Sequence, residues 1–195
     1  MSELEWVAAG LGVLNVFLVV RRSVWNYPFG LVMVALYFFV FFEARLYSDA
    51  LLQIFFFIVQ LYGWVNWVQA RTAAGEVPVG RMTGREHLLW AAGTVAASLV
   101  WGLGMAHYTN AAAPVIDAFI AGASISAQIL MARRRIENWA VWILVDVVAT
   151  GLYFSRQLYP TSALYLLFLL LSIAGLVGWR RALPDVQAGL GTTYA

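Results

Sequence analysis

Seven long stretches of this chain are apolar and nearly free of charged residues, and this pattern constrains the fold more than any other feature. They cover residues 4–20, 23–42, 50–68, 88–106, 113–132, 139–155 and 161–179. A helix needs about 20 mostly apolar residues to cross a hydrocarbon core of roughly 30 Å. The sequence therefore predicts an all-α integral membrane protein with seven transmembrane helices and lipid as its solvent.

Composition supports this prediction and excludes several classes of function. Of the 195 residues, 63% are hydrophobic and 11% are charged, whereas a soluble domain carries about 25% charge. The absence of cysteine excludes disulfides and thiolate sites, and the absence of lysine excludes Schiff-base and P-loop chemistry. A net charge of +2 is too small for a nucleic-acid surface, so no nucleic-acid partner is predicted.

Catalytic and metal-binding side chains are equally sparse. The two histidines, His87 and His107, are predicted on opposite sides of the membrane, so they cannot form a metal pair. The sequence also lacks a Gly-x-Ser-x-Gly motif. We therefore predict that the protein is not an enzyme and holds neither a metal nor another cofactor.

The distribution of arginine predicts the orientation. Ten of the twelve arginines follow the first, third, fifth and seventh stretches, and only Arg45 and Arg156 fall on the opposite side. Because cytoplasmic loops are enriched in basic residues, the N-terminus is predicted outside and the C-terminus in the cytoplasm. Three prolines, at positions 28, 114 and 160, are predicted at helix starts, where the missing N–H costs little.

The chain also contains an internal repeat. Trp25, Leu36-Tyr37, Leu46-Tyr47, Gly63 and Trp67 recur in the same order as Trp139, Leu152-Tyr153, Leu158-Tyr159, Gly175 and Trp179. One linker helix between the copies would make both enter the membrane in the same direction. This predicts a parallel 3+1+3 architecture: a first bundle at 1–69, a cytoplasmic loop and linker helix at 70–112, a second bundle at 113–181 and a cytoplasmic tail at 182–195. The alternative is a chance recurrence of Leu-Tyr in aromatic spans.

Polar side chains within the apolar stretches mark candidate binding residues, because each needs a partner, a water-filled cavity or a ligand. In the third stretch Gln53, Phe56 and Gln60 share one helical face. In the sixth, Asn138, Trp142 and Asp146 follow each other at intervals of four, with Trp139 beside them. A carboxylate flanked by indoles suits a flat cationic heteroaromatic ring. Alternatively, Asp146 bonds a neighbouring helix, and the glutamines hold helices together.

Other polar and aromatic residues are weaker candidates. Asn15, Gln128 and Tyr165 are possible further contributors to a binding site. Four tryptophans fall near the predicted membrane interfaces and are expected to belong to the aromatic belt: Trp64, Trp67, Trp101 and Trp179.

Two segments of the sequence resemble a known family. The first is residues 22–67, with Trp25-Asn26-Tyr27-Pro28-Phe29-Gly30 and Glu43-Ala44-Arg45-Leu46-Tyr47-Ser48-Asp49, and the second is residues 136–165, with Glu137-Asn138-Trp139 and Asp146. Both are similar to the PnuC family of vitamin transporters. The similarity covers the chain except residues 70–87 and the C-terminal tail. It implies a fold like that of a full-length SWEET transporter and a homotrimer in the bacterial inner membrane.

The resemblance also implies a function. It points to uptake of nicotinamide riboside by facilitated diffusion for NAD synthesis, with a cytoplasmic kinase trapping the product. Other members of the family carry thiamine, riboflavin or deoxynucleosides and differ chiefly in the sixth stretch, where this chain has a single acid at Asp146. Thiamine, another cationic heteroaromatic vitamin, stays open as an alternative, as does a membrane receptor or subunit that transports nothing.

Overall fold

The computed structural model describes residues 3–43, 47–108 and 114–183, and within these ranges every regular element is a helix. The helices are α1 (Glu3–Val20), α2 (Asn26–Glu43), α3 (Tyr47–Ala74), α4 (Gly84–Tyr108), α5 (Pro114–Ala132), α6 (Asn138–Ser155) and α7 (Tyr159–Arg181). Each of the seven predicted stretches lies largely within one of these helices, and the all-α prediction is confirmed. Six of the helices are long and apolar enough to cross a membrane, whereas the apolar part of α1, Trp6–Val20, is shorter.

The predicted proline positions are also borne out. Pro114 is the first residue of α5, Pro160 lies in the first turn of α7, and α2 begins two residues before Pro28. Proline supplies a backbone φ angle that is already helical and lacks only an N–H that the first turn leaves unbonded. Each of the three helices therefore begins within two residues of the proline that predicts its start.

The predicted loop at 70–87 is shorter in the structure, where it spans residues 75–83 between α3 and α4. Helix α3 continues through residues 70–74 and ends before Gly75, whose φ of 77° suits a glycine after a helix end. Helix α4 begins earlier than predicted because of a capping box. The Glu86 carboxylate accepts a hydrogen bond from the Thr83 N–H at 2.7 Å, and the Thr83 hydroxyl accepts one from the Glu86 N–H at 3.3 Å.

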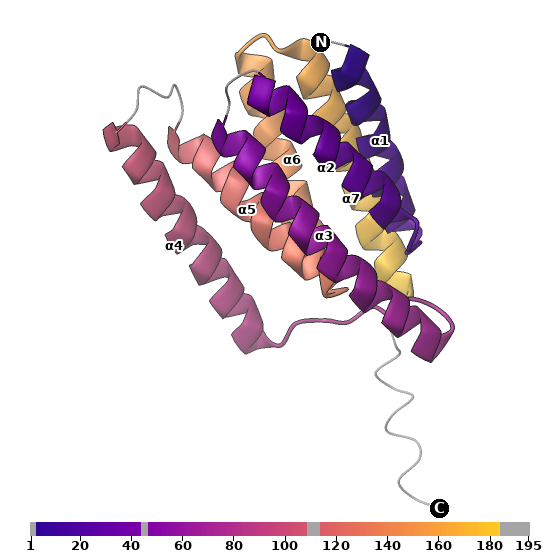
Figure 1. The fold of residues 1–195 in the computed structure, drawn as a ribbon. Helices are drawn as coiled ribbons and strands as arrows, with labels where there is room; N and C mark the ends of the chain where they lie inside the picture. The colour runs from indigo at the N-terminus through magenta and orange to yellow at the C-terminus, as the bar shows by residue number, and fades with distance from the viewer. Residues whose placement is uncertain (1–2, 44–46, 109–113, 184–195) are drawn as a thin grey trace, which may run out of the picture.

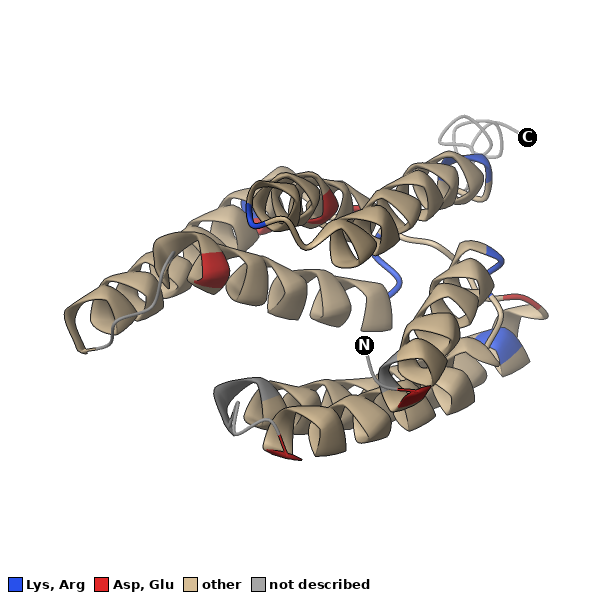
Figure 2. Ribbon diagram, turned by 90° about the horizontal axis from the view of Figure 1, so that it is seen from above, with Lys and Arg blue, Asp and Glu red and all other residues tan. Residues whose placement is uncertain are grey.

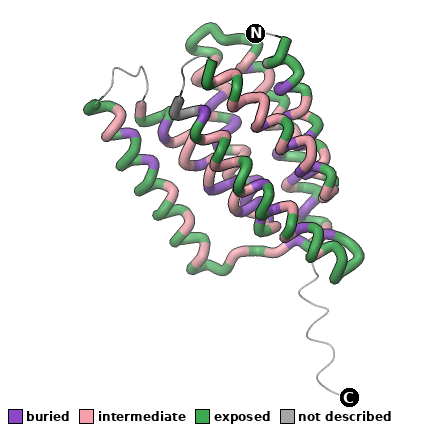
Figure 3. The backbone as a smooth tube through the Cα atoms, in the orientation of Figure 1, coloured by how far each residue is buried: buried purple, intermediate pink, exposed green. Residues whose placement is uncertain are grey.

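The helices form one bundle with α4 on its outside (Figure 1). Along the chain, α1 packs on α2, α2 on α3, α5 on α6 and α6 on α7, while α1 also contacts α7 and α3 contacts α5. Helix α4 packs on α5, and most of its surface is exposed (Figure 3). Charged residues lie mainly near the helix ends (Figure 2), which leaves the long faces of the bundle apolar.

We call one end of the bundle the Arg-rich end: it contains the turns after α1 and α5, the loop 75–83 and the end of α7. Four large aromatic side chains are buried there, namely Tyr27, Trp67, Trp139 and Trp179. Trp67 donates its indole N–H to the Met131 carbonyl, and Trp179 donates to the Val19 carbonyl, each at 3.1 Å. These bonds join α3 to α5 and α7 to α1.

Two expectations about tryptophan are therefore wrong. Trp67 and Trp179 are fully buried and do not belong to an exposed aromatic belt, because each indole N–H finds a carbonyl on another helix. Trp25 and Trp139, matched in the repeat, have different environments: Trp25 is 64% exposed and Trp139 is 1% exposed. The residue with the environment most like that of Trp139 is Tyr27, as described below.

Candidate functional site

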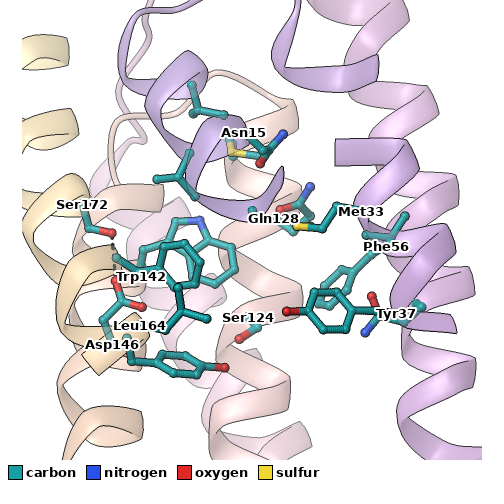
Figure 4. A pocket seen from close by; sticks show the side chains of 18 of the residues that line it. Asn15, Met33, Tyr37, Phe56, Ser124, Gln128, Trp142, Asp146, Leu164 and Ser172 are labelled. Carbon is teal, nitrogen blue, oxygen red and sulfur yellow. Dashed lines mark hydrogen bonds between the residues drawn. The ribbon is translucent and has the colours of Figure 1, made fainter. Parts of the chain in front are cut away.

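A cavity of about 450 Å³ lies between the helices. Its lining residues come from α1, α2, α3, α5, α6 and α7, and α4 contributes none among the described residues. Figure 4 shows labelled side chains from these helices around the cavity, with Asp146 and Ser172 on one side and Tyr37 and Phe56 on the other. A volume of this size is within the range of small-molecule sites.

The acidic side of the cavity is built from α6 and α7. Asp146 is 2% exposed and accepts a hydrogen bond from the Ser172 hydroxyl at 2.9 Å. Among the described lining residues, Asp146 is the one with a carboxyl group, and none is an arginine or a histidine. A carboxylate in such a place favours a ligand with positive charge, because burial makes an unpaired charge costly.

The amide side of the cavity comes from α1 and α3. Gln53 and Gln60 line it two turns apart on one face of α3, and Asn15 of α1 lies near Gln60. Gln60 is 3% exposed. Asn15 uses its amide N–H₂ to donate to the Asn26 carbonyl at 2.6 Å, which anchors it to the start of α2. Amides provide both donors and acceptors, so this side suits hydroxyl groups.

Gly30 explains how α2 comes so close to these amides. A methyl group added at Gly30 would overlap the Gln60 Oε1 atom and would lie 2.6 Å from Asn15 Nδ2. A side chain there cannot coexist with the observed positions of the two amides. The glycine is thus required for the close approach of the backbone and not for an unusual backbone angle.

Aromatic rings form the remaining walls. Trp142 and Tyr165 lie on the acidic side, and Tyr165 packs against Tyr153 and Phe168 with ring centroids 5.3 and 6.0 Å apart. Phe56 lies on the opposite wall (Figure 4). A flat ring that enters the cavity therefore meets aromatic surfaces next to a carboxylate, which is the arrangement that attracts organic cations.

Nine of the ten predicted binding residues meet at this cavity: Asn15, Gln53, Phe56, Gln60, Gln128, Trp139, Trp142, Asp146 and Tyr165. Gln53, Phe56 and Gln60, which were predicted to share one face of α3, all line the cavity. Asn138 is not brought to the cavity. It is the first residue of α6, is fully buried, and donates its amide N–H₂ to the Arg135 carbonyl at 2.6 Å, so it stabilises the turn before α6.

The structure adds residues to the site that the sequence analysis did not single out. Ser172 is the most important of these, because it bonds Asp146 directly. Its position seven residues after Tyr165 places both on one face of α7, which is a signal that the sequence contained. Gly12, Met33, Tyr37 and Ser124 line the cavity as well.

Nothing in the described part of the chain groups three or more His, Asp or Glu side chains that could hold a metal ion. The site therefore offers one carboxylate, several amides and aromatic faces. This set can bind and release an organic solute.

Comparisons with known proteins agree with this chemistry. A family model described as nicotinamide mononucleotide transporter matches residues 2–181. The nicotinamide riboside transporters PnuC of Neisseria mucosa and Escherichia coli are 31% and 29% identical to this chain. Those alignments cover 92% of this chain and 73% and 85% of the two relatives, respectively.

A relative with another substrate and a solved structure also match. The riboflavin/roseoflavin transporter RibM of Streptomyces davaonensis is 31% identical over 87% of this chain and 80% of its own length. A crystal structure of the vitamin B3 transporter PnuC superimposes with a TM-score of 0.75 at 31% identity, covering 92% of this chain and 81% of that one. The chain therefore belongs to the nicotinamide mononucleotide transporter family and is a multi-pass inner-membrane transporter, not an enzyme.

Proposed function

We propose that this protein transports nicotinamide riboside across the bacterial inner membrane and so supplies NAD synthesis. The observation that carries this proposal is the buried Asp146 carboxylate beside Trp142 in an otherwise uncharged cavity. Nicotinamide riboside carries a positively charged pyridinium ring and a neutral ribose, and the two sides of the cavity match these two parts. The names of the relatives from Neisseria mucosa and Escherichia coli support the same substrate.

The two sides of the cavity give the solute a defined orientation. The pyridinium ring stacks near Trp142 with its charge toward Asp146, because stacking and charge pairing then act on the same group. The ribose hydroxyls face Gln53 and Gln60, whose amides can both donate and accept. In this arrangement Ser172 holds the carboxylate in place through its hydroxyl.

The transport itself is proposed to be facilitated diffusion. Coupling to an ion needs a second site, and the described cavity lining contains no carboxylate besides Asp146. Net uptake then depends on removal of the solute inside the cell. Phosphorylation by a cytoplasmic kinase adds negative charge and makes the product unable to return through a site built for a cation.

The proposed architecture is the parallel 3+1+3 repeat, with a first unit at 1–69 and a second at 113–181. Equivalent contacts separated by 112 residues support it. Trp67 donates to Met131 of the second unit, and Trp179 donates to Val19 of the first, so donors and acceptors are both offset by 112 positions. We further propose that the N-terminus is outside, from the arginine distribution, and that the protein is a homotrimer, from the resemblance alone.

The aromatic and glycine contacts follow the same offset. Tyr27 packs edge-on against Trp67 with ring centroids 5.4 Å apart, and Trp139 packs edge-on against Trp179 at 5.5 Å. Gly63 faces the Tyr27 ring just as Gly175 faces the Trp139 ring. An axis that relates the two units would pass through the cavity, which lies between them.

Two other vitamins are alternative substrates. Riboflavin is favoured by the similarity to RibM, and thiamine shares the cationic heteroaromatic character that suits Asp146. Riboflavin is uncharged, so its recognition would not depend on a carboxylate. The alternative of a receptor that transports nothing is excluded by membership in a family of transporters.

The test is uptake of radiolabelled nicotinamide riboside into proteoliposomes that contain only this protein. We expect uptake that stops at equal concentrations on both sides and that continues when a kinase and ATP are enclosed. Unlabelled thiamine and riboflavin serve as competitors. Uptake of one of these vitamins without uptake of nicotinamide riboside would replace the substrate, and accumulation above equilibrium without a kinase would contradict facilitated diffusion.

A further inference from the structure

The loop between α3 and α4 is bound to the turns that follow α1 and α5. We call its residues 76–82 the strap. On the side of the first unit, Arg22 donates to the Val77 carbonyl at 3.0 Å and pairs with Glu76 at 3.1 Å. Since α3 leads directly into the strap, this side is also held by the covalent chain.

On the side of the second unit, the strap joins the turn between α5 and α6 as a short piece of parallel bridge. The Gly80 N–H donates to the Arg134 carbonyl, and the Ile136 N–H donates to the Gly80 carbonyl, both at 3.0 Å. Next to them, the Met82 N–H donates to the Glu137 carboxylate at 3.0 Å. The strap thus connects the first unit to the residues directly before α6.

The strap is also part of the hydrophobic core. Val77 and Val79 are 2% and 4% exposed. They pack in the same cluster as the four buried aromatic side chains of the Arg-rich end and as Val19 and Met131. The last two residues also line the cavity, together with Trp139, so the cluster separates the cavity from the Arg-rich end and the strap lies on its far side.

A solute that leaves the cavity at the Arg-rich end has to pass through this cluster. Its members come from α1, α2, α3, α5, α6, α7 and the strap, so a passage opens only when the two three-helix units separate there. Separation is incompatible with a strap that is hydrogen-bonded to both units. We propose that the strap is a latch that holds the Arg-rich end closed and that it detaches from the turn before α6 in every transport cycle.

A reversible cross-link tests this proposal, because the natural chain contains no cysteine. Gly80 and Arg135 are the bridged pair, and a side chain at Gly80 would point at Arg135, whose Nη1 atom would lie 3.2 Å from the new carbon. Bridged residues are about 5 Å apart, which a disulfide can span. The double variant Gly80→Cys/Arg135→Cys therefore ties the strap to the second unit under oxidation.

We expect the oxidised double variant to move nicotinamide riboside at least tenfold more slowly than the same sample after reduction, while it still binds the solute. The single variants Gly80→Cys and Arg135→Cys are matched controls and should not respond to oxidant. Equal transport rates in the oxidised and reduced double variant would overturn the latch.

A second measurement does not depend on the substrate. The thiol of Val79→Cys is buried while the strap is closed, so it should react slowly with N-ethylmaleimide. Adding Gly80→Pro removes the N–H that bonds Arg134 and should accelerate labelling at least tenfold. Gly84→Pro is the matched control, because proline is accepted at the first position of a helix such as α4.

Rapid labelling of Val79→Cys without the proline, or equal rates with and without Gly80→Pro, would also overturn the latch. If the natural protein carries no nicotinamide riboside in the same assay, the proposed substrate is wrong. The labelling experiment then decides about the strap alone, so the two proposals can fail separately.

Discussion

Asp146 is the residue on which recognition of a charged ring depends. Its carboxylate is buried beside Ser172 and faces a cavity that is otherwise uncharged among the described lining residues. We expect Asp146→Asn to weaken binding of nicotinamide riboside at least tenfold, because the neutral amide has the same shape but no charge to pair with the pyridinium ring. Binding can be measured by calorimetry in detergent.

Two controls make this prediction specific. Asp117 lies near the end of the bundle opposite the Arg-rich end, where it pairs with Arg156 at 3.8 Å and is about half exposed. Asp117→Asn should therefore leave binding unchanged. Riboflavin, which is uncharged, should compete with nicotinamide riboside for binding to Asp146→Asn as well as it does for the natural protein, or better. An unchanged affinity of Asp146→Asn for nicotinamide riboside would show that the carboxylate takes no part in binding.

Gly30 is a second residue with a specific role, because the structure leaves no space for a Cβ atom at this position. A methyl group at this position would overlap Gln60 and crowd Asn15. We expect Gly30→Ala to lower stability by about 1–3 kcal/mol and to weaken binding, because Gln60 has to turn away from its place in the cavity. Thermal unfolding in detergent and the binding assay are the two measurements.

Gly151→Ala is the matched control for Gly30→Ala. Gly151 also lies within a helix, α6, but a methyl group there meets no atom within 4 Å. Since alanine is a better helix former than glycine, this variant should be equally or more stable. Equal melting temperatures for the two variants would show that Gln60 and Asn15 yield without cost.

At the scale of helices, α4 depends on small residues for its contact with the bundle. Gly102 is buried, and a side chain there would lie 2.9 Å from the Val115 Cα atom on α5. Close backbone approach at small residues is how helices associate in lipid, where burial of apolar surface provides little drive. We expect Gly102→Val to lower the melting temperature in detergent.

Gly104→Val is the control on the same helix, two residues away. No atom lies within 4 Å of a side chain at Gly104, so valine there should change the melting temperature little. If both variants melt alike, the contact between α4 and α5 does not depend on close approach at Gly102.

The ends of α3 and α4 illustrate what hydropathy alone misses about an element. The apolar runs predicted a longer loop, whereas Gly75 and the Thr83–Glu86 capping box set the helix ends in the structure. Both signals are local and readable from sequence. Apolar length alone does not detect them, because these helices extend past their apolar parts into polar residues.

In the molecule as a whole, two equivalent hydrogen bonds from indole N–H groups join the two three-helix units. Trp67 and Trp179 each donate to a carbonyl of the other three-helix unit at 3.1 Å. If the units are related by an internal axis, Trp67→Phe and Trp179→Phe should destabilise the protein by similar amounts. Each should lose about 0.5–1.5 kcal/mol for the hydrogen bond, with a further loss for the smaller ring.

Trp101→Phe is the control for these variants. Trp101 is 59% exposed on α4, so its loss should shift thermal unfolding little. Strongly unequal effects of Trp67→Phe and Trp179→Phe would argue against equivalent roles and hence against the proposed repeat. The same variants should also speed the labelling of Val79→Cys if the aromatic cluster and the strap open together.

Local sequence patterns are sufficient to predict the helices and part of the site. Apolar length predicted all seven helices, because the helical hydrogen bonds of a membrane span are formed within the segment itself. Spacing within one helix correctly placed Gln53, Phe56 and Gln60 on a shared face, since the helical period fixes relative directions along a single element. Both inferences need only short-range information.

Which helix faces meet depends on the packing of the whole bundle. It buried Trp67 and Trp179, brought Ser172 to Asp146, and turned Asn138 away from the cavity. Hydropathy cannot distinguish a face that contacts lipid from one that contacts another helix, because both are apolar. The rotation of each helix about its axis is set by packing against its neighbours, and that packing brings residues of six helices together around one cavity.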